Sequence, residues 1–588
     1  MIWEYYRTKY NPFSKIVVFD VETRGLSARP ESFLFGVIYD GKRFYRYTTV
    51  LDMKNALFSF ANSGFIAVAH NMEYDLTTLF DNVILASSKY IHRQRFLKLQ
   101  FNPNRRSSNK RDKVLICIDS MNLFPVSLEQ IGKVYGLEKL NTDYQFSEKI
   151  TEDNWAYCER DCEVIYLAIN KLSDIIKRLY NSNLRLTLAS TSFQLAVNSF
   201  FQNGWLTQKE SYYNMQISDK MQEIAKKSYI GGFTRALRKG KHKITLYHYD
   251  INSSYPYSML QPYPDFRHCY TLFEPSRDAT QKILDAYEGF SLIKVLNCNT
   301  KYPYLPLKIE KMVYYPLMDG WKTYISFPEL RFLLAHSEYD IEIKELFYAQ
   351  RLKSPFEYIY NLYKLKQENK KKNPALSYTA KILLNASYGK FAQKNYDESF
   401  IMDFEKLVDE FLDKKDLDGL EKWQSNFEYC TEKNGILCGY LKTKPIDAKH
   451  DIYSIASYIT ARSRVLLWEY SQDSYYCDTD SIFIPYKIKE SKELGGWKLE
   501  DIATEIEIKG KKWYRYVTED GQKITKIKGV TLEKEDADFG NIKKYKTMIK
   551  AKSSIRRNLK AGEFIEVEKH LNDFDDTILP KKFNIANC

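Results

Sequence analysis

Two pairs of acidic residues have the spacing that lets both side chains face one metal ion. Asp20 and Glu22 lie two residues apart in the run KIVVFDVE, and Asp478 and Asp480 have the same spacing in YCDTDS. Residues two apart on a strand point to the same face of a sheet. Carboxylate oxygens bind hard divalent cations, and pairs of such cations catalyse displacement at phosphodiesters. Each spacing is a weak signal alone, because surface strands often show it.

Two more acidic residues can join the N-terminal pair. Asp75 follows the apolar run GFIAVA, which places it just past a strand in the same sheet as Asp20. Tyr157 and Asp161 lie one turn apart on a helical stretch, so both can face one pocket. The four carboxylates would bind two hard cations, one activating water and one stabilising a leaving oxygen. The phenol of Tyr157 would then orient the attacking water.

The second pair has the sequence context of a hairpin tip. Thr479 separates Asp478 from Asp480, and strand-like runs flank them on both sides. Two anions at one tip repel each other unless a cation offsets them, which favours a metal site. Asp250, at the end of the run LYHYD, supplies a third carboxylate. Asp250 and Asp480 are the expected metal ligands, and Asp478 is expected to contribute charge nearby.

Polar and aromatic residues near this pair could hold a nucleotide. Tyr255, shortly after Asp250, could form a floor beneath a sugar and exclude a 2′-hydroxyl; ordinary strand packing is the alternative. Lys381, Asn385 and Tyr388 share one stripe of the helical run YTAKILLNASYGKF. Lys381 could hold triphosphate oxygens, and Tyr388 could stack on a base pair. A solvated helix face would not explain the Tyr-Gly that ends the run.

Strand and helix patterns must position these residues. In the first part of the chain, strands are expected at 15–22, 33–39, 64–69 and 114–118, and a helix at 153–172. Residues 1–185 therefore indicate a compact α/β domain. Strand character returns around 239–257 and 475–485, on either side of a basic helical pair at 355–372 and 375–391. The charged stretch 395–450 resembles an insertion between catalytic elements.

The composition suits a large protein with a polyanionic partner. A length of 588 residues favours two or more domains. Lys and Arg number 88 against 75 Asp and Glu, giving a net charge of +13. Such an excess is more often a solvated surface, but 47 Tyr and 34 Phe also offer rings for stacking on bases.

The cysteines and apolar runs exclude several classes of protein. The nine cysteines form no set with zinc spacing, and Cys158 and Cys162, one helical turn apart, are expected to pack the helix. The N-terminus lacks the apolar segment of a signal peptide, and no apolar run has the length of a membrane span. We therefore expect no membrane partner and a cytoplasmic location.

Three N-terminal motifs resemble those of a known class of nuclease. The order DxE, NxxYD and YxxxD is similar to the exonuclease motifs of proofreading DNA polymerases of the DEDDy kind. The resemblance implies metal binding by Asp20, Glu22, Asp75 and Asp161, and positioning of water by Tyr157.

Other residues of this region match the same enzymes. By the resemblance, Asn71 and Tyr74 would support the metal site or contact single-stranded DNA. Ser127 and Leu128 begin a run similar to the SLxxh primer-strand motif of the protein-primed subset. Lys139 resembles the catalytic lysine of that subset, which would offset charge on the scissile phosphate; a surface lysine is the alternative.

The second half resembles family B DNA polymerases over residues 229–514. DxxSxYP, KxxxNxxYG and YxDTDS occur in the order of the family. One metal ion would bridge triphosphate oxygens, and a second would lower the pKa of the primer 3′-OH. DNA contacts are implied for Tyr229, Gly231 and Gly232 of a YxGG linker, for Thr460 and Arg464, and for Lys512 with Tyr514. Arg464 would contact the primer terminus, and Lys512 with Tyr514 would steady the primer strand.

The size of the chain and the SLxxh run resemble the protein-primed replicases of phages and linear plasmids. The implied fold is α/β and α+β multidomain, with an RNase H-like exonuclease domain (1–185) before a right-hand polymerase domain (186–588). The expected subdomains are the palm (186–265 and 451–504), a terminal-protein insertion (266–355), the fingers (356–394), a second insertion (395–450) and the thumb (505–588).

The resemblance also implies cofactors and partners. The cofactor is Mg²⁺, two ions per active site, with Mn²⁺ as an alternative. The partners are primer-template DNA, dNTPs and a terminal protein, for a monomer that replicates a linear genome in the host-cell cytoplasm.

Two departures and two alternatives accompany this interpretation. The motif reads Asn385-Ala386-Ser387-Tyr388, where the subgroup usually has Asn-Ser before an apolar residue and Tyr, so a serine contact is in doubt. The 395–450 stretch is longer and more charged than in the subgroup, which leaves processivity and strand displacement open. A DNA-primed or self-priming repair polymerase stays open. A non-catalytic DNA-binding relative is disfavoured because all seven expected acidic ligands are present.

Overall fold

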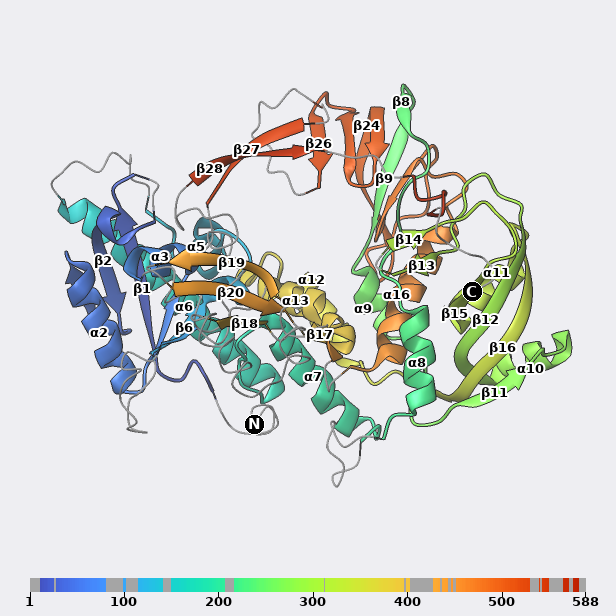
Figure 1. Ribbon diagram of the computed structural model, residues 1–588, viewed down its shortest axis with the longest axis horizontal. Coiled ribbons are helices and arrows are strands. Elements are labelled where there is room, and N and C mark those ends of the chain that lie inside the picture. Colours follow the sequence, from blue (N-terminus) through green and yellow to red (C-terminus); the bar gives the residue numbers. More distant parts are fainter. Residues whose placement is uncertain are drawn as a thin grey trace.

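The computed structural model arranges the chain along one long axis (Figure 1). The N-terminal sheet lies at one end, the sheet of residues 266–355 lies at the other, and helices α12 and α13 lie between them. The structure describes residues 11–25, 28–80, 99–101, 115–140, 150–206, 216–310, 312–395, 398–401, 427–433, 436–442, 446–447, 451–528, 539, 542–548, 564–570 and 575–580.

A six-stranded mixed sheet forms the N-terminal part, in the order β3-β2-β1-β4-β6-β5. β1 (Ile16–Thr23) is antiparallel to β2 (Phe33–Tyr39) and parallel to β4 (Ile66–Ala69). The other strands are β3 (Phe44–Tyr47), β5 (Leu99–Phe101) and β6 (Leu115–Asp119). The four strands predicted in this region are confirmed to within a few residues.

Helices cover both faces of this sheet because β1 buries apolar side chains on both sides. α2 (Val50–Asn62) and α3 (Glu73–Leu79) pack on one face. α5 (Leu128–Tyr135) and α6 (Glu152–Tyr180) pack on the other, and α6 continues past the predicted end at 172. Two more helices, α7 (Leu188–Gln202) and α8 (Asp219–Ser228), lead to the next sheet.

An eight-stranded sheet holds Asp250 and the Asp478–Asp480 hairpin, in the order β26-β25-β24-β9-β23-β22-β7, with β8 paired to β24. Its strands are β7 (Thr234–Ala236), β8 (Gly240–His242), β9 (Leu246–Ile251), β22 (Tyr476–Asp478), β23 (Ser481–Ile484), β24 (Trp497–Gly510), β25 (Trp513–Thr518) and β26 (Lys523–Ile527). Helices α9 (Ser254–Met259) and α16 (Tyr453–Trp468) pack together beside it. The expected boundary between palm and thumb near 505 falls inside β24, so the palm sheet continues into the segment predicted as thumb.

Residues 266–355 build a separate antiparallel sheet around two long strands, β12 (Tyr287–Cys298) and β16 (Tyr339–Leu352). Its smaller strands are β10 (Tyr263–Pro264), which lies just before this range, β11 (Tyr270–Phe273) and β15 (Lys322–Ser326), while β13 (Leu307–Ile309) and β14 (Met312–Tyr314) form a separate two-stranded sheet. The helices are α10 (Arg277–Ala286) and α11 (Phe327–Ala335). α11 packs against α16, so this sheet is joined directly to the helices beside the eight-stranded sheet.

Two antiparallel helices lie between the N-terminal sheet and the eight-stranded sheet (Figure 1), where α13 contacts α5, α6, α7 and α9. They are α12 (Tyr358–Asn369) and α13 (Pro374–Ala386), and the side chain of Asn373 caps α13. The helix predicted to reach residue 391 ends at Ala386, and a 3-10 turn, η4 (Gly389–Ala392), follows.

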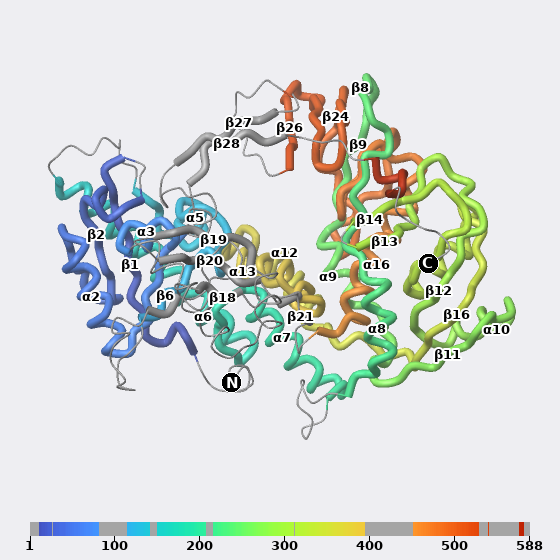
Figure 2. Tube along the Cα trace, viewed as in Figure 1, coloured from blue at the N-terminus to red at the C-terminus, as the bar shows by residue number. Residues whose placement is uncertain are grey.

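Figure 2 shows the same view as a Cα trace, and seven further strands of the described residues lie outside the sheets above. They are β17 (Lys394–Asn395), β18 (Glu398–Ile401), β19 (Phe427–Lys433), β20 (Ile436–Lys442), β21 (Ile446–Asp447), β27 (Ile542–Met548) and β28 (Phe564–His570). Most of the expected second insertion, 395–450, and much of the expected thumb lie outside the described residues. Among the helices that the structure describes, none is long and apolar enough to cross a membrane.

Candidate active sites

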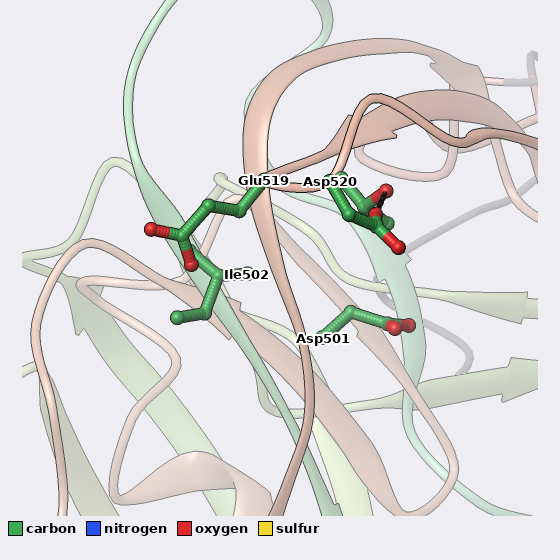
Figure 3. A pocket seen from close by; sticks show the side chains of 5 residues that line it. Asp501, Ile502, Glu519 and Asp520 are labelled. Carbon is green, nitrogen blue, oxygen red and sulfur yellow. Dashed lines mark hydrogen bonds between the residues drawn. The ribbon is translucent and has the colours of Figure 1, made fainter.

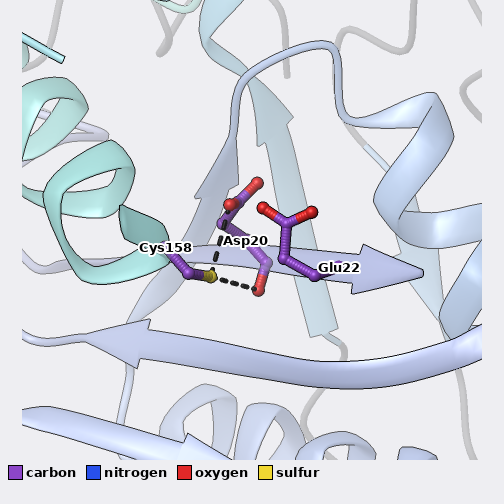
Figure 4. Close-up of side chains that lie close together, drawn as sticks. All are labelled: Asp20, Glu22 and Cys158. Atoms are coloured by element: carbon purple, nitrogen blue, oxygen red, sulfur yellow. Dashed lines mark hydrogen bonds between the residues drawn. The ribbon is translucent and has the colours of Figure 1, made fainter. Parts of the chain in front are cut away.

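The first centre lies where β1, α3 and α6 meet. β1 presents Asp20 and Glu22 on one face, as the spacing predicted, and both carboxylates point the same way (Figure 4). The Val21 amide donates to Asp75 Oδ1 at 3.1 Å, which fixes the α3 carboxylate beside them. Burial raises the pKa of Asp20, although Lys139 opposes this effect. Burial and the nearby Asp20 charge raise the pKa of Asp75 well above its usual range.

α6 adds the fourth carboxylate together with its aromatic neighbour. Burial, then the charge of Asp20, raises the pKa of Asp161 to about 7. Asp161 Oδ2 accepts from Lys139 Nζ at 2.5 Å, and the same ammonium lies 4.5 Å from the centre of the Tyr157 ring. Burial alone would lower the pKa of Lys139, but the charge and the hydrogen bond of Asp161, together with Tyr157, outweigh burial and raise the pKa. Lys139 therefore belongs to the centre and is not a solvated surface lysine.

The loop around this centre holds the residues expected to contact DNA. Asn71 is exposed with a left-handed φ of 59°, and its backbone N–H donates to Asp119 Oδ1 at 3.1 Å. The hydroxyl of Tyr74 lies 2.5 Å from Thr23 Oγ1. Ser127 is exposed and accepts from the Gln130 amide at the start of α5, while Leu128 packs partly against the core.

The second centre is a two-residue turn beside the end of a neighbouring strand. Asp478 pairs with Ser481 across the β22–β23 hairpin, and Ser481 pairs in turn with Asp250 on β9. Thr479, in the turn, has a φ of 63°, the left-handed backbone conformation typical of tight hairpin turns. The predicted hairpin tip and the predicted approach of Asp250 are both confirmed.

The carboxylates of Asp250, Asp478 and Asp480 lie close enough to repel one another. Burial, then the charge of Asp480, raises the pKa of Asp250 to about 7. Burial, then Asp478, raises the pKa of Asp480 to about 6. Lys512 Nζ lies 3.1 Å from Asp478 Oδ1, and Thr234 donates to the same oxygen at 3.1 Å. Lys498 and Lys366 oppose the rise for Asp250, and Lys512 opposes it for Asp480, but both pKa values stay raised. Crowded carboxylates of this kind suit hard cations as ligands.

Two tyrosines border the turn. The rings of Tyr255 and Tyr388 lie 4.2 Å apart between centres, at 42° to each other. Gly232 allows this arrangement, because a Cβ at that position would lie 2.8 Å from both the Tyr255 hydroxyl and Thr479 Cγ2. Tyr388 lies just beyond the end of α13, and so it faces Tyr255 from a turn instead of the predicted helical stripe.

The basic side of the centre contains one residue that sequence reasoning missed. Lys381 and Asn385 are exposed on α13, as predicted. Lys366, on α12, donates to Ser253 Oγ at 3.4 Å, and its charge also acts on Asp250. Burial, then Lys381, lowers the pKa of Lys366. The basic run around Lys366 was visible in the sequence, but nothing local distinguished this lysine from its exposed neighbours.

Two predicted DNA contacts are wrong. Arg464 is fully buried; its guanidinium pairs with Glu329 at 2.6 Å and donates to the carbonyls of Ile230 and Gly231. Thr460 is also buried, and its hydroxyl donates to carbonyls of its own helix. Neither side chain reaches a surface where DNA could lie. Arg464 instead fixes the linker that contains Gly232.

The other expected contacts divide between exposed and buried positions. Lys512 is about half exposed, whereas Tyr514 is 7% exposed and its ring packs 4.5 Å from that of Tyr476. Tyr229 is partly buried against Tyr453, and Gly231 is exposed on the linker. Of the pair expected to steady a primer, Lys512 alone offers an accessible charge.

An open cavity of about 350 Å³ lies apart from both centres, on β24 and β25 (Figure 3). Its lining residues are Asp501, Ile502, Thr518, Glu519 and Asp520. Asp501 accepts from the Tyr516 hydroxyl at 2.7 Å, and Asp520 accepts from Thr518, so two of the three carboxylates already have donors. This cavity adds no chemistry to the two centres.

Comparisons with known proteins show the family of the chain. The family model described as DNA polymerase type B, organellar and viral, matches residues 138–483. The chain is 23% identical to a probable DNA polymerase of Neurospora intermedia over 85% of its own length and 59% of the relative. It is 25% identical to the DNA-directed DNA polymerase of Enterobacteria phage PRD1, over 72% of this chain and 70% of that one.

A solved structure has the same fold. Phi29 DNA polymerase complexed with primer-template DNA and incoming nucleotides matches 95% of this chain and 99% of its own, with a TM-score of 0.67 at 16% identity. This likeness confirms the predicted fold class, a multidomain α/β and α+β chain. The chain spans only 59% of the Neurospora relative.

Proposed function

The chain belongs to the organellar and viral DNA polymerases of type B, and from this membership we propose that it synthesises DNA on a DNA template and proofreads the product. Synthesis takes place at Asp250, Asp478 and Asp480. A 3′→5′ exonuclease works at the centre of Asp20, Glu22, Asp75 and Asp161. The observation that carries the proposal is the convergence of Asp250 with Asp480 through the pairing of β9 and β23.

The donor set of each centre fits two Mg²⁺ ions, with Mn²⁺ as an alternative. Asp250 and Asp480 would hold them in the synthetic centre, and their raised pKa values reflect charge that a cation would offset. When bound, the ions would stabilise charge on the triphosphate and lower the pKa of the primer 3′-OH. In the nuclease centre the four acidic residues, Asp20, Glu22, Asp75 and Asp161, would be the ligands.

The side chains around the synthetic centre bind and select the nucleotide. Lys366, whose charge acts on Asp250, and the exposed Lys381, whose charge acts on Lys366, hold the triphosphate, while Asn385 is exposed one turn after Lys381 on α13. Tyr388 stacks on the nascent base pair. Tyr255, held against Tyr388, excludes a 2′-hydroxyl and so selects deoxyribose.

The nuclease centre positions water and offsets charge. The Tyr157 hydroxyl orients the attacking water, and Lys139 balances charge at the scissile phosphate while its contact with Asp161 fixes its position. Asn71, Tyr74, Ser127 and Leu128 lie at the rim, where a single-stranded 3′ end would pass. Tyr229, Gly231, Gly232 and Lys512 would contact the DNA duplex at the other centre.

Synthesis starts from a hydroxyl of a terminal protein, which docks on the sheet of residues 266–355. The resemblance to protein-primed replicases supports this step, as does the packing of α11 in that sheet against the palm helix α16. The enzyme then acts as a monomer on a linear genome in the host-cell cytoplasm. DNA-primed or self-priming repair synthesis is the second candidate, favoured by the departures at Ser387 and 395–450.

Two assays test the proposal. Wild type with Mg²⁺ and dNTPs should extend a primed template, and Asp480→Ala should not; failure of wild type would end the polymerase assignment. Asp20→Ala combined with Glu22→Ala should abolish degradation of single-stranded 3′ ends and leave extension intact. For protein priming, transfer of one nucleotide to a Ser, Thr or Tyr hydroxyl of a separate protein is expected, and extension from DNA primers alone would favour the repair function.

A further inference from the structure

The nuclease centre contains a sulfur atom that the proposed chemistry does not use. Cys158 follows Tyr157 on α6 and is fully buried. Its thiol donates to Asp20 Oδ2 at 3.3 Å and to the Asp20 carbonyl oxygen at 3.7 Å (Figure 4). The sulfur and one carboxylate oxygen each of Asp20 and Glu22 lie within 4.8 Å of one another. A sulfur atom, a ligand for soft metal ions, thus lies beside carboxylate oxygens, which are ligands for hard metal ions.

The second cysteine of α6 provides a contrast. Cys162 is one turn further along the helix and equally buried, but its sulfur lies 3.9 Å from the Val37 carbonyl oxygen. It shares no ligand geometry with Asp20 and Glu22. The two thiols therefore differ in position and hardly at all in burial, so Cys162 is a matched control for Cys158.

Asp161 gives an independent sign that a cation fits here. It follows Cys158 by three residues on the same helix, and it interacts with Asp20. Its Oδ1 atom is buried and has no hydrogen-bond partner among the described residues, while Oδ2 accepts from Lys139. A buried carboxylate oxygen without a donor is costly, and a bound cation would remove that cost.

We propose that Asp20, Glu22 and Cys158 form a site for one thiophilic divalent cation such as Zn²⁺ or Cd²⁺. Thiolate sulfur favours such ions over Mg²⁺, which takes oxygen ligands. Zn–S bonds are about 2.3 Å and Zn–O bonds about 2.0–2.2 Å, so ligand atoms in a tetrahedral site lie roughly 3.5 Å apart. The three ligand atoms reach this spacing with small side-chain movements. On binding, the thiol proton that Cys158 gives to Asp20 leaves for solvent, and a metal–sulfur bond replaces the S–H bond.

The consequence for activity rests on the proposed exonuclease. The thiophilic cation takes the two carboxylates that Mg²⁺ needs, and so it stops degradation. The synthetic centre has no equivalent, because Cys477 alternates with Asp478 on β22 and its thiol lies on the opposite face of the sheet. Low concentrations of Zn²⁺ therefore suppress proofreading and spare synthesis.

Direct binding is tested without any activity. The reduced, metal-free full chain is titrated with Cd²⁺ while the near-ultraviolet absorbance of cadmium–thiolate bonds is recorded. Wild type and Cys162→Ser should give the same band, and Cys158→Ser should lose it. Asp20→Asn should weaken Cd²⁺ binding by at least about tenfold, since even outer partners of a metal site are worth roughly 10–100-fold. A band that persists in Cys158→Ser, or its absence from wild type, would overturn the site; circular dichroism verifies that each variant is folded.

A second measurement links the site to the exonuclease. Zn²⁺ at micromolar concentration is added to Mg²⁺-dependent degradation of a single-stranded 3′ end. Wild type and Cys162→Ser should be inhibited, and Cys158→Ser should resist. Equal inhibition of Cys158→Ser and wild type would overturn the proposed effect on proofreading. If wild type degrades nothing in Mg²⁺ alone but still shows the cadmium band, the exonuclease proposal fails and the cation site stands.

Discussion

The substitution Glu329→Gln tests whether Arg464 supports the palm from inside instead of contacting a primer. The two side chains are 0% and 1% exposed and lie 2.6 Å apart. Removing one partner of a buried pair leaves an unbalanced charge and costs about 3–5 kcal/mol of unfolding free energy. For a cooperative unit of 150–250 residues each kcal/mol lowers Tm by about 2–4 °C, so the expected drop is on the order of 6–20 °C.

The matched control is a surface pair with the same chemistry. Lys353 and Glu357 are 2.6 Å apart but 85% and 59% exposed. Such pairs contribute about 0–1 kcal/mol, so Glu357→Gln should shift Tm by no more than about 4 °C. Thermal unfolding of both variants is followed by circular dichroism. Equal midpoints for Glu329→Gln and Glu357→Gln would refute the internal role of Arg464.

Three further predictions follow from the second centre. Gly232→Ala puts a Cβ 2.8 Å from the side chains of Tyr255 and Thr479. Because this displaces active-site groups, primer extension should slow on the order of 100-fold while degradation continues. Unchanged extension in a primer assay would contradict this prediction. Lys366→Ala should raise the KM for dNTPs on the order of tenfold by loss of a charged contact worth about 1.5–3 kcal/mol, and the exposed Lys364→Ala is the comparison; equal KM values would count against Lys366. Without metal, in EDTA, the pKa values of Asp250 and Asp480 are about 7 and about 6, against an ordinary 3.8. Between pH 4 and pH 7 the folded state therefore binds more protons than the unfolded state, and Tm should fall as pH rises over this range. Mg²⁺ should reverse that fall, and Asp250→Asn with Asp480→Asn should flatten it; an equally steep fall in the double variant would contradict the assignment.

Local patterns were enough to place the carboxylates. Asp20 and Glu22 share a face because side chains alternate along a strand. Asp478 and Asp480 lie at a hairpin tip because Thr479 and Asp480 form a two-residue turn between β22 and β23. Both features follow from short-range backbone geometry. The strand 33–39 was predicted to the residue for the same reason.

Contacts between distant parts of the chain could not be predicted from local sequence patterns. Arg464 meets Glu329, 135 residues away, and no local feature of either segment marks the pair. A family motif indicates that an arginine matters but not which group it contacts. Cys158 was assigned to helix packing because its partner Asp20 lies 138 residues away. Lys366 was missed because only the fold distinguishes it from other lysines of α12.

The most direct test of the two-centre account removes one carboxylate from either centre and compares the two variants in the same assay. One preparation of each protein receives Mg²⁺, dNTPs and a primer-template with a labelled 5′ end, so that extension and degradation are read on the same strand. Asp250→Ala should shorten the primer without extending it, and Asp20→Ala should extend it without shortening it. If either single substitution removes both activities, or if Asp250→Ala still extends the primer, the assignment of separate centres is wrong.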